Sequence, residues 1–271
     1  MKTPSNFSSS GVRDWWNNQA KTMPESAGIL SVFGADQFSL LYRKNAEWQH
    51  FRRIASLDKS MRVLELGCGA GRWSILIAPY VKEVIAIDFS EEMIRLAETA
   101  AEQSNIKNIQ FHVGPAQDFV SMTQFDLIYL SGVDQYIEEG ALYSVISNIR
   151  KMVATNGIVI DRVTTSTSER FFCDIDGYKC IYRSLPELEC AFSEAGFELT
   201  YKEQSHQRFR LSRISRWPLF MKGMVWMMKR NPRSACLLVQ VITTVLNIVR
   251  PLKPMASDRS HDFLLFRLLK S

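Results

Sequence analysis

The sequence predicts an α/β protein with a doubly wound, seven-stranded and mostly parallel sheet. From Met61 onward, short runs rich in Val, Ile and Leu alternate with amphipathic segments of helical length. This alternation is typical of a parallel sheet whose crossover helices cover both faces. The chain has 271 residues, of which 46% are hydrophobic and 23% charged. That length and composition predict one globular domain with extensions and exclude a wholly disordered chain.

The strands and helices of this sheet can be placed along the chain. The expected strands are Arg62–Leu66, Val84–Asp88, Ile109–Val113, Phe125–Leu130, Gly157–Val163, Phe197–Glu203 and Asp262–Leu268. The expected helices are Trp73–Tyr80, Glu91–Gln103, Ala141–Met152 and Leu185–Glu194. Ser90 precedes two acidic residues, which predicts an N-cap and favourable charges at the start of the second helix.

Two additions lie outside this core. Residues 1–60 form an N-terminal helical cap segment, with a tryptophan pair at Trp15 and Trp16 and a helix expected near Phe38–Ile54. Residues 204–260 form a helical insertion between the sixth and seventh strands, where most such folds need only a hairpin. The predicted core consists of the remaining residues, 61–203 and 261–271.

Charge is distributed unevenly along the chain. The segment Gln204–Ser257 contains ten basic residues and no Asp or Glu. Since the whole chain carries +5 and this segment +10, the rest of the chain carries −5. The basic residues are Arg208, Arg210, Arg213, Arg216, Lys222, Lys229, Arg230, Arg233, Arg250 and Lys253. An acidic body therefore carries a basic and apolar insertion.

The cysteines and the N-terminal residues indicate where in the cell the protein is expected. The five cysteines are an odd number without a CxxC motif, which predicts neither a disulfide framework nor a zinc site. The four histidines are scattered, so no metal site is expected. The first residues lack the apolar run of a signal peptide. We therefore expect a cytoplasmic protein.

A glycine-rich turn follows the first strand. The run Val63–Gly71 reads VLELGCGAG, and its alternate glycines allow a ligand to approach the backbone closely. The helix that follows offers unpaired N–H groups to an anion. A dinucleotide fingerprint needs glycine where Arg72 stands, which disfavours a dinucleotide-dependent oxidoreductase. Asp88 ends the second strand, where an acid accepts ribose hydroxyls, and Phe89 follows it as a candidate to stack on a purine.

With these motifs, residues 62–163 resemble the class I S-adenosylmethionine-dependent methyltransferases. The resemblance rests on Glu65 and the three glycines, on Asp88, on Phe125-Asp126 and on Asn156-Gly157. It implies a Rossmann-like methyltransferase fold and S-adenosyl-L-methionine as the cofactor. The residues expected to bind that cofactor are Glu65, Gly67, Cys68, Gly69, Gly71, Asp88, Phe89, Ala116, Gln117, Ser131, Tyr42 and Arg72. Pro115 departs from the family pattern, so adenine contacts are assigned to the Ala116 backbone and Gln117.

The catalytic candidates lie in the loop after the fourth strand. Ligands bind outside the carboxyl ends of parallel strands, so Asp134 and Tyr136 are expected to face the methyl group. An alcohol acceptor needs a base, and this loop lacks the histidine that many small-molecule methyltransferases carry. Each residue also has a structural alternative. Asp134 could equally cap the following helix, and Tyr136 could serve only to pack the core.

The insertion has two interpretations. Ser234–Val249 has no charge but is too short and too polar to span a membrane, which needs roughly 20 apolar residues. The run Trp217–Arg230 mixes Trp, Phe and Met with cations, a composition typical of a membrane interface. The segment is therefore a lid over the substrate, or a contact with an anionic membrane surface through residues 204–260, peripheral at the inner face, and the two can coexist. Nucleic acid is not an expected partner, since no recognisable binding module is present.

Together these features predict a methyltransferase. The expected reaction is O-methylation of a small molecule, or of a sugar or lipid-linked glycan precursor, by in-line methyl transfer. Two alternatives remain: a dinucleotide-dependent oxidoreductase, and a non-catalytic adaptor on the same fold that docks to a membrane or a partner enzyme.

Overall fold

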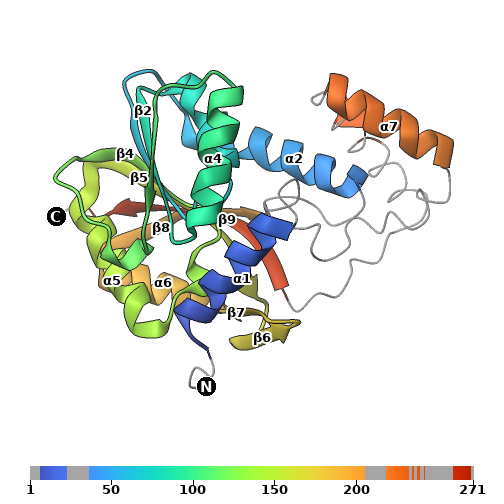
Figure 1. Ribbon diagram of the computed structural model, residues 1–271. Helices are drawn as coiled ribbons and strands as arrows, with labels where there is room; N and C mark the ends of the chain where they lie inside the picture. The colour runs from blue at the N-terminus through green and yellow to red at the C-terminus, as the bar shows by residue number, and fades with distance from the viewer. Residues whose placement is uncertain are drawn as a thin grey trace. The chain divides into compact units, whose positions relative to one another are not determined.

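The computed structural model describes residues 7–22, 37–204, 218–231 and 259–269, together with positions 234, 237, 238 and 241. Side chains at 37–40, 42, 218–221 and 228 lie outside this description. The chain forms two compact units (Figure 1). The first contains Met1–Gly28, Ala55–Gln204 and Asp258–Ser271, and the second contains Ile29–Ile54 and Ser205–Ser257.

The first unit is built on a seven-stranded sheet with the order β3-β2-β1-β4-β5-β9-β8. Its strands are β1 (Arg62–Leu66), β2 (Glu83–Asp88), β3 (Ile109–Val113), β4 (Phe125–Leu130), β5 (Val153–Ser166), β8 (Phe197–Gln204) and β9 (Arg259–Leu268). Only β9 runs against its neighbours in this sheet, and the other ladders are parallel. The predicted fold class, a doubly wound and mostly parallel sheet of seven strands, is confirmed.

Strand β5 departs from its expected start. It begins at Val153 rather than Gly157, because Val153 pairs with Phe125 before the register shifts between Phe125 and Leu127. The Asn156-Gly157 pair therefore lies within the strand and does not precede it as a turn. Gly157 is required there, since an added Cβ would lie 2.8 Å from Val153 Cγ2 and 2.9 Å from the Phe125 carbonyl oxygen.

Helices cover both faces of the sheet, as the alternating pattern predicts. They are α3 (Arg72–Ile77, continued by a short 3-10 turn, Ala78–Tyr80), α4 (Glu91–Gln103), α5 (Glu139–Met152) and α6 (Leu185–Glu194). Helices α5 and α6 bury their apolar sides in the main core with Ile128 and Leu130 of β4. Tyr129, which alternates to the other face, packs edge-on against Trp73 of α3, with ring centroids 5.2 Å apart. The predicted cap of α4 is confirmed, because Ser90 Oγ accepts the Met93 N–H at 3.1 Å.

A hairpin between β5 and α6 was not expected. Strands β6 (Phe171–Ile175) and β7 (Tyr178–Tyr182) pair antiparallel through a turn in which Asp176 has φ 50° and Gly177 φ 79°. Two successive positive φ values match the two-residue turn that fits the twist of paired strands. Helix α1 (Ser9–Thr22) contacts this hairpin, and Trp15 Nε1 donates to the Asp176 carbonyl at 3.3 Å.

The predicted cap segment divides between the two units. Helix α1 belongs to the first unit and packs on α4, whereas α2 (Gln37–Ala55) lies almost wholly in the second. Within α2, the buried side chains of Arg43 and Glu47 form an ion pair at 2.7 Å. Helix α7 (Pro218–Arg230) also belongs to the second unit. No helix among the described residues is long and apolar enough to cross a membrane.

Candidate cofactor site

The glycine turn after β1 bends sharply against β2. Gly67 and Cys68 both donate their N–H groups to the Ile87 carbonyl, at 2.8 and 3.0 Å. The three glycines have positive φ values of 75°, 53° and 74°, which side chains rarely adopt. An added Cβ would lie 2.7 Å from Val133 Cβ at Gly67 and 2.8 Å from Ala97 Cβ at Gly71, but would meet no atom within 4 Å at Gly69. The open side of the turn at Gly69 therefore leaves room for a ligand.

Asp88 lies at the end of β2, opposite this turn. Its Oδ2 accepts the Gly69 N–H at 2.8 Å, and its Oδ1 accepts the Ser90 N–H at 2.9 Å. The residue is 7% exposed, and its burial raises the carboxyl pKa to about 6. Each carboxylate oxygen has a second lone pair, so Asp88 can still accept hydrogen bonds from a bound hydroxyl pair.

A pocket opens beside these residues at the carboxyl ends of the strands. Six predicted site residues line it: Gly67, Asp88, Phe89, Ala116, Gln117 and Tyr136. Six further residues line the pocket that no sequence motif assigned to the site: Ser9, Ile87, Gly114, Pro115, Val133 and Ile137. Ser9 comes from the start of α1, so a helix far away in the sequence forms part of this wall. Pro115 departs from the family pattern in sequence, but it still lines the pocket together with Gly114, Ala116 and Gln117.

Glu65 and Ser131 lie beneath the turn rather than in the pocket wall. Glu65 is fully buried and accepts a short hydrogen bond from the Ser74 hydroxyl. Burial raises its pKa to about 7, against the opposing effect of hydrogen bonds from Ser74 and Ser131. The Ser131 N–H donates to the Leu66 carbonyl at 3.0 Å. Both residues thus hold the start of the loop after β4 against the glycine turn.

The two catalytic candidates occupy different positions. Tyr136 lines the pocket, and its hydroxyl lies 2.9 Å from that of Tyr178, a residue of β7 that the sequence analysis did not single out. Burial raises the pKa of Tyr136 well above its usual value, so its hydroxyl stays protonated. Asp134 is 1% exposed and does not line this pocket. Its burial raises the carboxyl pKa to about 6, against the opposing effect of Arg183. Neither residue caps α5, which Glu138 precedes.

Besides Glu65 and Ser131, the described residues Cys68, Gly69, Gly71 and Arg72 were predicted to contact the cofactor but do not line this pocket. The Arg72 guanidinium lies over the Trp73 ring, 4.7 Å from its centroid. The Cys68 side chain is buried, and its Sγ lies 3.6 Å from the Gly69 carbonyl oxygen. The Tyr42 side chain is outside the described residues, although its backbone belongs to α2. The roles of these residues stay predictions.

The sheet order, the glycine turn and the acid ending β2 define the class I S-adenosylmethionine-dependent methyltransferases. The sequence profile of the methyltransferase domain matches residues 57–195, just over half of the 271 residues. The chain belongs to this methyltransferase family. It is therefore an S-adenosylmethionine-dependent methyltransferase, and the alternatives of an oxidoreductase and a non-catalytic adaptor are set aside.

Named relatives agree with this family. The chain is 24% identical over 204 residues to the ubiquinone biosynthesis O-methyltransferase of Azorhizobium caulinodans, covering 69% of this chain and 76% of that protein. It is 27% identical over 144 residues to the malonyl-[acyl-carrier protein] O-methyltransferase of Bacillus anthracis. That second match covers 52% of each chain, so this chain spans about half of that relative.

Solved structures share the fold at low identity. A Burkholderia thailandensis 1,6-didemethyltoxoflavin-N1-methyltransferase superposes with a TM-score of 0.63 at 11% identity, covering 100% of this chain and 92% of that one. The [4+2]-cyclase SpnF superposes with a TM-score of 0.59 at 16% identity, covering 84% and 82%. Because a cyclase and an N-methyltransferase share it, the fold alone does not decide which atom is methylated.

The described residues fit S-adenosylmethionine. The carboxylate of Asp88 has lone pairs for the ribose hydroxyls, and the space at Gly69 lies next to it. Phe89, Ala116 and Gln117 line the same pocket and offer an aromatic face, backbone groups and an amide to the adenine. When bound, the cofactor supplies an electrophilic methyl group on a sulfonium.

Proposed function

We propose that this enzyme methylates a hydroxyl group of a small molecule, or of a sugar or lipid-linked glycan precursor. The observation that carries the proposal is the Tyr136 side chain in the pocket wall, whose hydroxyl lies 2.9 Å from the hydroxyl of Tyr178. Burial raises the pKa of both phenols, which keeps both protonated. One hydroxyl donates to the other, so the Tyr136 O–H can donate to an acceptor oxygen when Tyr178 is the donor within the pair. The names of the two relatives, both O-methyltransferases, support a hydroxyl or carboxyl oxygen as the acceptor.

We assign different roles to Tyr136 and Asp134, the two catalytic candidates in the loop after β4. Tyr136 orients the acceptor, and its ring is held edge-on against Trp16 of α1, with centroids 5.7 Å apart. Asp134 is the proposed base, since a carboxyl with a pKa of about 6 is mostly ionised at neutral pH. Because its side chain is buried and does not line the pocket, this role requires the loop after β4 to move when the acceptor binds. Methyl transfer also needs water excluded from the pocket, which the aromatic cluster around Tyr136 favours.

The acceptor can be identified by transfer of labelled methyl groups. We expect label from S-adenosylmethionine in a phenol, a sugar hydroxyl or a prenyl-linked saccharide, as a product stable to mild alkali. An alkali-labile product would instead be a methyl ester and would favour a carboxyl acceptor. Label found on nitrogen or carbon would contradict O-methylation.

With that acceptor, Tyr136→Phe and Asp134→Asn should each lower kcat by about 10²-fold, the scale for losing a positioned acid or base. The affinity for S-adenosylhomocysteine should stay within about twofold for Tyr136→Phe, because the ring remains in the wall. Tyr143→Phe is the matched control, since that tyrosine is 40% exposed on α5 and outside the pocket. Full turnover in both test variants would remove these side chains from the mechanism.

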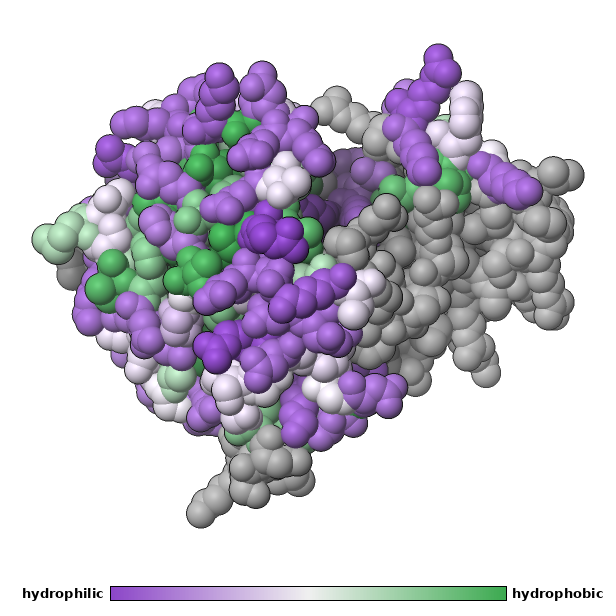
Figure 2. Space-filling model, viewed as in Figure 1, coloured by the Kyte–Doolittle hydropathy of each residue, from purple (hydrophilic) through white to green (hydrophobic). Residues whose placement is uncertain are grey.

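We further propose that residues 204–260 bring the enzyme to an anionic membrane surface, as a peripheral protein at the inner face of the membrane. In α7 the exposed residues Lys222, Trp226, Lys229 and Arg230 share one side of the helix, while Met224 is buried. Trp226 is 63% exposed, with the Arg230 guanidinium 5.5 Å from its ring centroid. Figure 2 shows hydrophilic side chains projecting from α7 beside apolar surface. A tryptophan among cations is typical of a membrane interface.

Vesicle co-sedimentation tests this surface. The protein should bind vesicles that contain phosphatidylglycerol in preference to pure phosphatidylcholine, and lose much of that preference in high salt. Trp226→Ser should weaken the remaining binding several-fold, and Met122→Ser, at a 99% exposed site of the first unit, is the matched control. Within the same run, Trp217 and the side chain of Phe220 lie outside the described residues. Equal sedimentation with and without anionic lipid would leave the insertion as a substrate lid.

A further inference from the structure

A buried arginine contacts the 3-10 turn that carries Tyr136. The turn spans Asp134–Tyr136 in the loop after β4, and Arg183 directly follows β7, the second strand of the hairpin. Arg183 is 2% exposed. A guanidinium is costly to bury unless acceptors take up its N–H groups. The acceptors that Arg183 meets are therefore what allows an arginine to be buried here.

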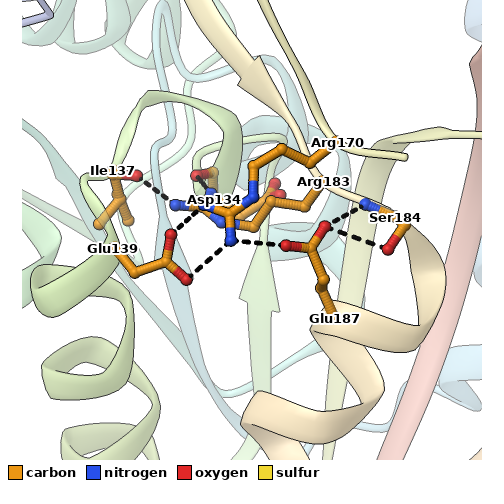
Figure 3. Close-up of polar contacts among 7 residues, drawn as sticks. All are labelled: Asp134, Ile137, Glu139, Arg170, Arg183, Ser184 and Glu187. Atoms are coloured by element: carbon orange, nitrogen blue, oxygen red, sulfur yellow. Dashed lines mark hydrogen bonds and ion pairs between the residues drawn. The ribbon is translucent and has the colours of Figure 1, made fainter. Parts of the chain in front are cut away.

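The guanidinium donates to both ends of this turn. Its Nη1 donates to the Asp134 carbonyl and its Nη2 to the Ile137 carbonyl, each at 2.7 Å (Figure 3). The Asp134 carbonyl also accepts the Ile137 N–H at 3.1 Å, the hydrogen bond that closes the turn. Two nitrogens of one planar group thus fix the backbone on either side of Tyr136. A lysine carries its donors on a single nitrogen and cannot reproduce this geometry.

The backbone that carries this side chain is itself held. The Ser166 N–H, at the end of β5, donates to the Arg183 carbonyl at 2.8 Å. The next residue, Ser184, precedes α6, and its N–H donates to the Glu187 carboxylate at 2.9 Å (Figure 3). The sheet and α6 therefore determine where the guanidinium lies, because both ends of the Arg183 side chain are fixed.

The turn forms part of the pocket wall through Tyr136 and Ile137. The Tyr136 hydroxyl lies 2.9 Å from that of Tyr178 on β7, and its ring packs edge-on against Trp16. The side chain of Tyr136 is thus held by the hairpin and by α1, and its backbone by Arg183. A shift of that backbone would move the Tyr136 hydroxyl relative to a molecule in the pocket. A misplacement of about 1 Å can slow a reaction by about 10²-fold.

We propose that Arg183 is a positioning residue for methyl transfer, which fixes the turn Asp134–Tyr136 and thereby directs the Tyr136 hydroxyl toward the acceptor. Arg183 does not line the pocket, so it acts through the turn and does not touch the reacting atoms. The inference rests on the proposed function in taking Tyr136 as the side chain that orients the acceptor. Because the Asp134 carbonyl is held, the movement that brings its carboxyl into the pocket has to come from residues 131–133 and from rotation of that side chain.

A second arginine provides a matched control. Arg170 forms ion pairs with Glu187, at 2.6 Å, and with Glu139 (Figure 3). Among the described residues, Arg170 contacts these side chains and no backbone atom of the turn. Arg170→Lys therefore alters a neighbouring guanidinium without releasing the turn.

Residue-resolved amide hydrogen exchange tests the hold on the turn and needs neither cofactor nor acceptor. Arg183→Lys should speed exchange at Ile137 by at least about tenfold, whereas Arg170→Lys should change it by less than about twofold. The Asp118 amide, which closes the 3-10 turn Ala116–Asp118, is the internal reference. Exchange at Ile137 that is unchanged in Arg183→Lys, or that is as fast as at Asp118 in the wild type, would overturn the proposal.

Turnover then tests the link to Tyr136. Arg183→Lys should lower kcat by at least about tenfold and change S-adenosylhomocysteine affinity by less than about threefold, since Arg183 makes no described contact with Asp88. Arg170→Lys should keep kcat within about twofold of wild type. Added to Tyr136→Phe, Arg183→Lys should lower kcat by only about twofold more, because the hydroxyl that it positions is already gone. Losses that multiply would show a general structural role and overturn the proposal.

The proposal and the proposed function fail in different ways. Label on nitrogen or carbon would contradict O-methylation alone, because kcat is measured with whichever acceptor takes the label. Unchanged kcat in Arg183→Lys, where Tyr136→Phe is impaired, would overturn the role of Arg183 alone. If Arg183→Lys does not fold, the wild-type exchange rates at Ile137 and Asp118 still test the hold on the turn.

Discussion

Gly69→Val is expected to abolish binding of S-adenosylhomocysteine in a protein that still folds. An added Cβ at this position meets no protein atom within 4 Å, so the branched side chain would fill space left for the ligand. The backbone cost of a side chain at φ 53° is about 1–2 kcal/mol. Calorimetric titration should therefore show a loss of at least about 100-fold in affinity, which is about 2.7 kcal/mol, with a small fall in melting temperature.

Two other glycines serve as controls for this result. Gly140→Val places a side chain in open space on α5, away from the pocket, and should change neither folding nor affinity appreciably. Gly71→Val forces a Cβ to within 2.8 Å of Ala97 on α4 and should destabilise the fold itself. Wild-type affinity in Gly69→Val would mean that the glycine turn has a structural role alone.

Asp88→Ala is expected to weaken S-adenosylhomocysteine binding by about 1.5–3 kcal/mol, the scale for ribose hydroxyls left without a charged acceptor. The substitution also removes the acceptor for the N–H groups of Gly69 and Ser90, at 2.8 and 2.9 Å. Asp88→Asn is the more selective variant, because it keeps the size of the side chain and one acceptor oxygen. An unchanged affinity in both variants would remove Asp88 from the ribose site.

The pH dependence of binding isolates the charge of Asp88. Its folded pKa of about 6 lies above the unfolded value of 3.8, so the free protein gains stability from this group as pH falls from 6 to 4. The ribose hydroxyls instead favour the ionised form, so affinity should decline as pH drops through 6. In Asp88→Asn, affinity should not decline as pH drops through 6. The titration of Glu65, whose pKa is about 7, should still affect affinity in both the wild type and this variant.

The sheet was predictable because each buried strand is a short aliphatic run followed by a polar turn. The hairpin β6–β7 was not, since Phe171–Tyr182 mixes aromatic, charged and cysteine residues without a strong alternation. Its pairing depends on tertiary contacts, such as Trp15 of α1 against Tyr178, with ring centroids 5.2 Å apart. The one local signal was the Asp176-Gly177 turn, which favours a hairpin.

The site was predictable where a motif fixes the backbone. The glycine turn and the acid ending β2 belong to adjacent strands, so their sequence positions determine their proximity. The loop after β4 lacks this constraint. The sequence places Asp134 and Tyr136 two residues apart, but only packing decides that Tyr136 lines the pocket while Asp134 lies against Arg183. Ser9 and Tyr178 reach the site from distant segments, which no local pattern indicates.

The register of the last two strands bears on how such an enzyme changes during evolution. Gln204, the last residue of β8, pairs with Asp262 near the start of β9. The chain thus leaves the sheet at the end of β8 and re-enters it at a neighbouring position in β9, independently of the length of the segment between the two strands. Closing a longer loop there costs only about 0.6 kcal/mol for each doubling of its length. The segment between these strands can therefore be exchanged or lengthened as a cassette, leaving the cofactor strands untouched.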